Sequence, residues 1–289
     1  SAALRGQLLL PGSADYDAAR SIWNAMIDRR PAIIVRCATT EDVVAAVRFA
    51  VNNRLLLSIR GGGHNIAGSA VCDDGLTIDL SAMNTVEVDR ESGTARVGPG
   101  ATLGDVDRAT QAHGLATPVG INSTTGIAGL TLGGGFGWLS RSLGLTIDNL
   151  ISADVVTAAG QLVRASATEH EDLFWAIRGG GGNFGIVTSF KFRLHRIGPG
   201  VVAGLVIHPV DAAGEVLRFY RDFIKTTPEQ FVCWFVMRKA PPLPFLAPEW
   251  HGKEILALAM CYAGGVAEGE AVAGPLRAFG RPIADVVGP

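Results

Sequence analysis

The chain has 289 residues, of which 48% are hydrophobic and 18% charged, values typical of a globular protein with a sizeable core. No apolar run approaches the roughly 20 residues that a membrane-spanning helix needs, so such a helix is excluded. The formal net charge of −2 gives no electrostatic reason to expect a nucleic acid or an anionic membrane surface as a partner.

The four cysteines are widely spaced, which predicts buried free thiols rather than a disulfide framework or a zinc site; they are Cys37, Cys72, Cys233 and Cys261. The N-terminus carries no secretory signal segment, which favours a cytoplasmic location. Because the chain starts at Ser1 rather than at Met, secretion after removal of a leader is the alternative.

The first half of the chain predicts both helices and strands. Residues 39–53 place Thr39 and Asp42 at the spacing of a capping box, followed by valine and alanine at helical intervals. A second capping box, at Thr102 and Asp105, predicts a helix over residues 101–114. Short apolar or alternating runs predict strands at 55–59 and 76–80, and a hairpin around residues 90–93.

Similar signals continue to residue 197. Residues 151–166 predict a hairpin that turns at Ala159 and Gly160, and residues 186–197 predict a strand. On that strand one face carries Phe190, Phe192 and Leu194. Between them, residues 168–178 predict a helix that begins with a Thr168–Glu171 box. Beyond 197 glycine becomes scarce, and the proline-rich run 240–250 predicts an extended loop, so we place a domain boundary at 197.

Three glycine clusters stand out among the 37 glycines, at Gly61–Gly63, Gly133–Gly137 and Gly179–Gly182. The last cluster matches the spacing GxGxxG, but a nicotinamide-binding motif must follow a strand and open a helix. Here a predicted helix precedes the glycines and a strand follows them, which excludes that type of site. Backbone N–H groups in such turns can bind the phosphates of an extended ligand. Tight turns and close packing are the alternative explanation.

Motifs around the three clusters resemble one family of flavoproteins. "RGGGHN", "TTGIAGLTLGGGFGWLSRSLGLTIDNL" and "DLFWAIRGGGGNFGIVTSFKFRL" are similar to segments of berberine-bridge-enzyme-like oxidoreductases, within the vanillyl-alcohol-oxidase / p-cresol-methylhydroxylase (PCMH) superfamily. The single-histidyl bacterial branch is the most similar. The resemblance implies an α+β fold, with a two-subdomain PCMH-type FAD-binding domain over residues 1–197 and its motifs between 30 and 197. Residues 198–289 would begin an antiparallel-sheet substrate domain and leave it incomplete.

The same resemblance assigns residues to FAD. His64 would carry a covalent bond to the methyl group on the benzenoid ring of the flavin. A structural histidine that caps a turn is the alternative for His64. The pyrophosphate would be wrapped by Arg60, Gly61, Gly62, Gly63 and Asn65. A wall along the cofactor would be formed by Thr125, Gly126, Gly129, Leu130, Gly133, Gly134 and Gly137, with Leu145 and Asn149 nearby. The adenine end would be closed by Gly185, Ile186 and Val187.

Two departures from the family pattern limit the expected chemistry. Asn122 stands where some members attach the flavin a second time through cysteine, and a carboxamide cannot form that thioether. Members also carry a longer substrate domain that supplies the catalytic base, so we expect residues 1–289 to hold FAD without the base. The other histidines are expected to be structural, and no metal is expected; these histidines are His113, His170, His195, His208 and His251.

The resemblance implies an FAD-dependent oxidase. A C–H bond of a small alcohol, sugar or amine would deliver hydride to the flavin, and dioxygen would accept the electrons. The alternatives are a flavin dehydrogenase or reductase on the same fold and a flavin-carrying binding protein without turnover. Neither the identity of the substrate nor an oligomeric state follows from the sequence.

Overall fold

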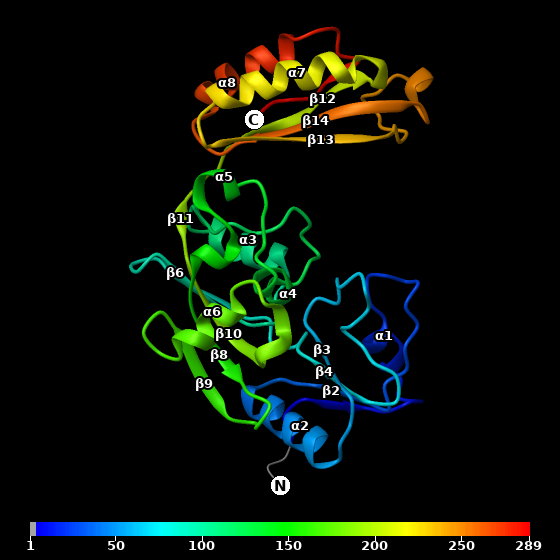
Figure 1. Cartoon of the computed structure of the whole chain (residues 1–289), viewed down its shortest axis with the longest axis vertical. Coiled ribbons are helices and arrows are strands. Elements are labelled where there is room, and N and C mark those ends of the chain that lie inside the picture. The colour runs from blue at the N-terminus through cyan, green and yellow to red at the C-terminus, as the bar shows by residue number, and fades with distance from the viewer. Residues whose placement is uncertain (1–3) are drawn as a thin grey trace. The chain divides into compact units, whose positions relative to one another are not determined.

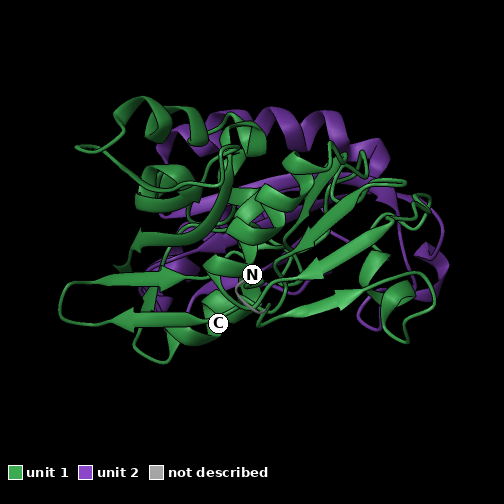
Figure 2. Cartoon of the chain, turned by 90° about the horizontal axis from the view of Figure 1, so that it is seen from below, with its two compact units in different colours: residues 1–196 green, residues 197–289 purple. Residues whose placement is uncertain are grey.

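The computed structural model describes residues 4–289, and the chain divides into two compact units, residues 1–196 and 197–289 (Figures 1 and 2). Each unit has its own sheets and its own hydrophobic core. The mixture of helices with separate, largely antiparallel sheets confirms the α+β class.

The first sheet of unit 1 has the strand order β1-β2-β4-β3. Its strands are β1 (Gln7–Leu9), β2 (Ile33–Arg36), β3 (Leu57–Arg60) and β4 (Leu76–Asp79). Strands β2, β4 and β3 are parallel, whereas β1 pairs with β2 in the antiparallel direction. The predicted strand at 76–80 is confirmed, but as a central parallel strand it is buried on both faces, so that Thr77 and Asp79 are buried as well.

The crossover from β2 to β3, which are both parallel to β4, contains α2 (Thr40–Asn52). The predicted capping box is confirmed, because the side chains of Thr39 and Asp42 each accept a backbone N–H of the other residue. Asp42 also accepts the backbone N–H groups of Arg5 and Gly6, at 2.9 and 3.0 Å, which ties the N-terminal segment to this helix. Helix α2 packs against the two larger sheets of unit 1. A short α1 (Tyr16–Arg20) precedes β2.

The second sheet of unit 1 is antiparallel, with the order β5-β6-β10-β8-β9. Its strands are β5 (Val86–Asp89), β6 (Thr94–Val97), β8 (Leu150–Val156), β9 (Leu162–Ser166) and β10 (Ile186–Arg193). Both predicted hairpins are therefore confirmed. Phe190 and Phe192 are completely buried in the core of this sheet, as the alternation predicts. The core is completed by residues of α3 (Leu103–Gln111), α4 (Ile127–Leu132) and α6 (Glu171–Ile177).

The start of α6 differs from the prediction. The expected box of Thr168 and Glu171 does not form; instead His170 is the N-cap residue, in the left-handed region at φ 46° and without a side-chain cap. Ser166 and Glu169 form an isolated β-bridge, which holds Thr168 in a turn too early for capping. The α3 box of Thr102 and Asp105 forms as predicted. Smaller elements of unit 1 are β7 (Leu115–Ala116), α5 (Ser140–Leu143), η1 (Thr146–Asn149), η2 (Gly181–Phe184) and β11 (His195–Arg196).

Unit 2 is an antiparallel sheet with the order β13-β14-β12-β15, and its two longer helices lie along one face (Figure 1). The strands are β12 (Val202–Pro209), β13 (Phe231–Lys239), β14 (Glu254–Tyr262) and β15 (Ala284–Asp285), and the helices are α7 (Ala213–Phe223) and α8 (Val266–Ala278). Short turns are η3 (Val210–Ala212), η4 (Ile224–Thr226) and η5 (Pro248–Trp250). The proline-rich run forms the loop between β13 and β14, and its Leu246 packs on the other face of the sheet.

All four cysteines are free and buried, as predicted. None of the helices within residues 4–289 combines the length and the hydropathy needed to cross a membrane.

Candidate functional site

A continuous groove in unit 1 brings the three glycine clusters together. One part, of about 290 Å³, is lined by the "RGGGHN" loop and the start of α4. The other part, of about 540 Å³, is lined by β3, α4 and the third glycine cluster. The two parts share Ile59, Gly61, Asn65, Ala70 and Gly129. We call the whole hollow the glycine groove.

At one wall of the groove, two backbone segments approach each other so closely that no side chain fits between them. Gly62 and Gly126 face each other, and a Cβ atom on either residue would overlap backbone atoms of the other. Only two glycines allow this contact between the "RGGGHN" loop and the N-terminus of α4. The contact therefore holds the loop against the helix and shapes the groove.

The "RGGGHN" loop also offers a run of unused hydrogen-bond donors. Within the described residues, no protein acceptor is found for the five successive backbone N–H groups from Gly61 to Asn65. Their residues all line the groove. Because unpaired backbone N–H groups are costly away from water, such a run is suited to an anionic ligand such as a pyrophosphate.

His64 is held at this end of the groove by contacts on its face and on its edge. Its Nε2 lies 3.0 Å from Thr124 Oγ1, and Trp23 stacks on its ring at a centroid distance of 5.4 Å and an interplanar angle of 23°. Thr124 in turn donates its hydroxyl to Asn122 Oδ1 at 2.9 Å. Burial lowers the pKa of the His64 imidazole, so that the ring is neutral at neutral pH.

Arg60 does not line the groove, although the resemblance placed it at the pyrophosphate. Its guanidinium lies 3.2 Å from the fully buried carboxylate of Asp79, which Arg36 also contacts at 3.1 Å. The remaining Nη2 donates to the carbonyl of Ser21 at 3.3 Å. Asp79 therefore directs Arg60 away from the groove, and Arg60 anchors the loop instead.

Four further candidates lie outside the lining, in the segment after α4; they are Gly134, Gly137, Leu145 and Asn149. Asn149 is buried, donates to the carbonyls of Leu143 and Leu145 at 2.9 and 3.0 Å, and lies 2.6 Å from His195 Nε2. The remaining candidates line the groove; they are Gly61, Gly62, Gly63, His64, Asn65, Thr125, Gly126, Gly129, Leu130, Gly133, Gly185, Ile186 and Val187.

Sequence reasoning missed part of the lining and the partners of His64. The unassigned lining residues are Leu57, Ser58, Ile59, Ser69, Ala70, Leu80, Ala128, Leu132, Gly181, Gly182 and Asn183. Two of these, Gly181 and Gly182, belong to the third cluster, whose glycine content was the available signal. Neither Trp23 nor Thr124 carries a local signal that connects it with His64.

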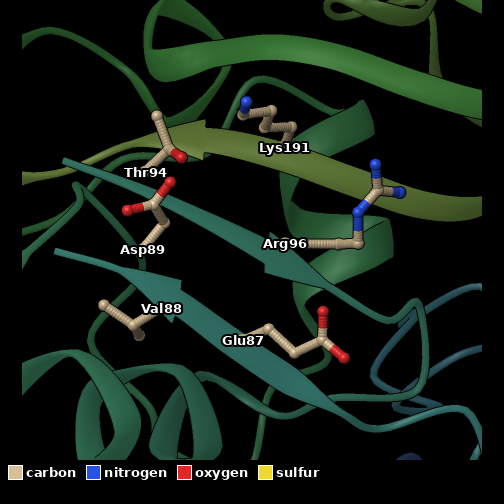
Figure 3. A pocket seen from close by; sticks show the side chains of 6 residues that line it. All are labelled: Glu87, Val88, Asp89, Thr94, Arg96 and Lys191. Carbon is tan, nitrogen blue, oxygen red and sulfur yellow. The ribbon is translucent and has the colours of Figure 1, made fainter. Parts of the chain in front are cut away.

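A second hollow, of about 250 Å³, lies on β5, β6 and β10 (Figure 3). It carries both charges: Glu87 and Asp89 on one strand, and Arg96 and Lys191 on the neighbouring ones. Arg96 is paired with Asp154 at 3.1 Å, and Asp89 accepts from the Ser92 backbone N–H at 3.1 Å. Arg96 and Asp89 are thus already bonded to residues outside the lining, so this hollow is the weaker candidate.

The described residues offer no cluster of three or more His, Cys, Asp or Glu side chains suited to a metal ion. Two histidines outside the groove lie within hydrogen-bond distance of backbone carbonyls. His170 Nδ1 lies 2.8 Å from the Arg164 carbonyl, and His251 Nε2 lies 3.1 Å from the Leu246 carbonyl. His208 is buried, and burial lowers its pKa.

Comparison with known proteins identifies the family of the chain. Residues 31–166 match the family of FAD binding domains. The chain is 38% identical to (R)-6-hydroxynicotine oxidase of Paenarthrobacter nicotinovorans over 203 residues, which are 70% of this chain and 44% of the relative. It is 43% identical to the FAD-linked oxidoreductase pgmH of Aspergillus terreus over 199 residues, 68% of this chain and 40% of the relative.

Solved structures agree with these relatives. The crystal structure of 6-hydroxy-D-nicotine oxidase from Arthrobacter nicotinovorans superposes with a TM-score of 0.89 at 30% identity, over 99% of this chain and 62% of that one. The xylooligosaccharide oxidase of Myceliophthora thermophila gives 0.84 at 30% identity, over 98% and 59%. The chain thus spans about half the length of the curated relatives that it matches.

FAD is therefore the cofactor, and the glycine groove is the candidate site for it. The chain belongs to the berberine-bridge-enzyme-like family of FAD-linked oxidoreductases. The donors of the "RGGGHN" loop and the glycine contact between Gly62 and Gly126 fit an extended dinucleotide.

Proposed function

We propose that the protein is an FAD-dependent oxidase whose flavin is covalently bound through His64 alone. In this proposal residues 1–197 form the FAD-binding domain and residues 198–289 begin the substrate domain. The substrate is a small alcohol, sugar or amine. The observation that carries the proposal is the placement of a neutral, oriented imidazole at the end of a run of free backbone N–H groups in the groove.

The hydrogen bonds of His64 favour one attachment atom. Asn122 Oδ1 accepts both the backbone N–H and the hydroxyl of Thr124, so the Thr124 oxygen is left to accept from Nε2–H of His64. With the proton on Nε2, the lone pair lies on Nδ1. A neutral imidazole with a free lone pair is a nucleophile near neutral pH. Asn122 therefore orients Thr124 and cannot itself bind the flavin.

The protein's part in the redox reaction is to bind and position. FAD supplies the acceptor for the hydride of the substrate C–H bond, and dioxygen accepts the two electrons and yields hydrogen peroxide. The backbone N–H groups of the loop bind the pyrophosphate, and the Gly62–Gly126 contact holds them in place. Apart from His64, none of the side chains that line the groove has a pKa near neutrality, so the catalytic base comes from residues outside this lining.

Support for an oxidase also comes from the relatives. The names of two compared proteins describe oxidases, one of a hydroxynicotine and one of xylooligosaccharides. An amine and a sugar are thus handled by proteins of similar structure, which is why we propose this range of substrates.

The linkage and the reaction are tested separately. Digestion of the flavin-loaded protein, followed by mass spectrometry, should give one flavin-bearing peptide, which contains His64. For the reaction, the natural full-length enzyme is mixed with alcohols, sugars and cyclic amines, first without and then with dioxygen. Flavin reduction followed by stoichiometric peroxide supports an oxidase. Reduction without peroxide in air indicates a dehydrogenase, and no reduction by any donor indicates a flavin-carrying protein.

A further inference from the structure

A short N-terminal segment, residues 21–24, lies across the "RGGGHN" loop. Three hydrogen bonds join the two: Arg60 Nη2 to the Ser21 carbonyl at 3.3 Å, the Trp23 backbone N–H to the Gly63 carbonyl at 3.1 Å, and Asn24 Nδ2 to the Ile66 carbonyl at 2.8 Å. They reach the first residue of the loop, its middle, and the residue that directly follows it. We call this segment the N-terminal strap.

The strap places one large side chain on His64. The Trp23 ring stacks on the imidazole at 5.4 Å, while 58% of the Trp23 residue remains exposed to solvent. Thr124 holds the edge of the same ring through Nε2 at 3.0 Å. The strap therefore contacts the face of the imidazole, and the segment before α4 contacts its edge.

His64 needs such a support because of the residues that precede it. Three successive glycines allow the backbone many conformations, and Gly63 adopts φ 68°, in the left-handed region. A reactive side chain must stay within about 0.5 Å of its productive position, which a loop rich in glycine does not ensure by itself. An aromatic neighbour that is itself tied to the loop supplies this restraint.

We propose that Trp23 is a positioning residue that holds His64 in the orientation required for flavin attachment. The assignment rests on the covalent linkage proposed above. In the attachment, a C–H bond of the flavin methyl group and the N–H bond of the imidazole break, and a C–N bond forms. The two electrons and two protons released pass to dioxygen, which gives hydrogen peroxide.

The test compares Trp23→Ala and Trp23→Phe with wild type and with the control Trp175→Ala. Trp175 lies on α6 with 79% exposure and outside the groove lining. Flavin-free protein is mixed with FAD in air, and acid-stable flavin is followed with time. We expect Trp23→Ala to slow attachment about three- to tenfold, which corresponds to the strength of an aromatic pair. Trp23→Phe keeps a stacking face and should remain close to wild type, as should the control.

Two readouts separate positioning from a general loss of structure. Non-covalent FAD affinity, measured in a His64→Ala background, should not change when Trp23 is also replaced. In flavin-free protein, the ring-current shift of the His64 ring protons should disappear in Trp23→Ala and persist in Trp23→Phe.

The outcomes are distinct. Attachment at the wild-type rate in Trp23→Ala would overturn the role of Trp23 while leaving the linkage intact. A loss of rate matched by an equal loss of non-covalent affinity would show that the strap only stabilises the groove, and would also overturn it. If the wild-type protein itself forms no acid-stable flavin, the proposed linkage fails and the role of Trp23 fails with it.

Discussion

Gly129 gives the sharpest test of the glycine groove, because replacement by alanine should affect stability and FAD binding in opposite directions. Gly129 lies inside α4, lines both parts of the groove, and has open space where a Cβ would stand. Alanine in a helix interior is more favourable than glycine by about 0.5–1 kcal/mol. For a unit of this size, we expect the unfolding midpoint of the flavin-free protein to rise by about 1–4 °C.

The same methyl group projects into the space that FAD uses. Forcing an extra carbon into a well-packed contact costs about 1–3 kcal/mol, which corresponds to a loss of FAD affinity of about 5- to 150-fold. Affinity is measured by quenching of flavin fluorescence in a His64→Ala background, so that covalent attachment does not interfere. Stability is measured by thermal unfolding of the same flavin-free protein.

Gly274→Ala is the matched control for Gly129→Ala. Gly274 lies inside α8, also faces open space, and belongs to unit 2 rather than to the groove. It should show no loss of affinity for FAD. If Gly129→Ala bound FAD as tightly as the parent protein, the groove would not be the cofactor site, and the reasoning from its lining would be refuted.

Three further outcomes follow from His64 and its partners. His64→Ala should still bind FAD through the backbone N–H groups but lose all acid-stable colour, measured after acid precipitation; acid-stable flavin in this variant would place the linkage elsewhere. Thr124→Val removes the acceptor for His64 Nε2. Attachment should slow about three- to tenfold, because one hydrogen bond of about 1 kcal/mol is lost. Thr124→Ser keeps the hydroxyl acceptor and should attach flavin at the wild-type rate. The attachment rate, measured from pH 5 to 8, should fall as the pH is lowered, because only the neutral imidazole attacks the flavin. Its midpoint should lie below the ordinary pKa of histidine, since burial lowers the pKa of His64. A midpoint above the ordinary value would contradict a buried His64.

The start of a helix was predictable where the residues that cap it lie within one helical turn of each other. The capping boxes of Thr39 and Thr102 formed because the partner stands three residues away on the same helix. The box expected at Thr168 failed because a bridge between Ser166 and Glu169, outside the helix, decided where that helix begins. A local motif therefore predicts a helix start only when the preceding chain is free to adopt it.

In the candidate site, too, the residues present were predictable from the sequence, whereas the contacts of their side chains were not. The glycine clusters are recognisable in the sequence itself, and the resemblance of their motifs to a flavoprotein family singled out His64. Arg60 stands in the same motif, yet its guanidinium lies on Asp79 of the neighbouring strand. A buried carboxylate attracts a nearby guanidinium strongly, and only the pairing of β3 with β4 brings the two together.

By itself the sequence determined that the cofactor is FAD, because the motifs that resemble those of FAD-linked oxidoreductases are continuous in the chain; it predicted the glycine loops as the site. Only the tertiary structure decided how His64 is held, because Trp23 and Thr124 come from segments far away in the sequence on either side. It also decided that Gly62 must face Gly126, since that restriction exists only once the loop and α4 are packed together. Side-chain orientation in the groove depends on such contacts between distant segments, which no local pattern encodes.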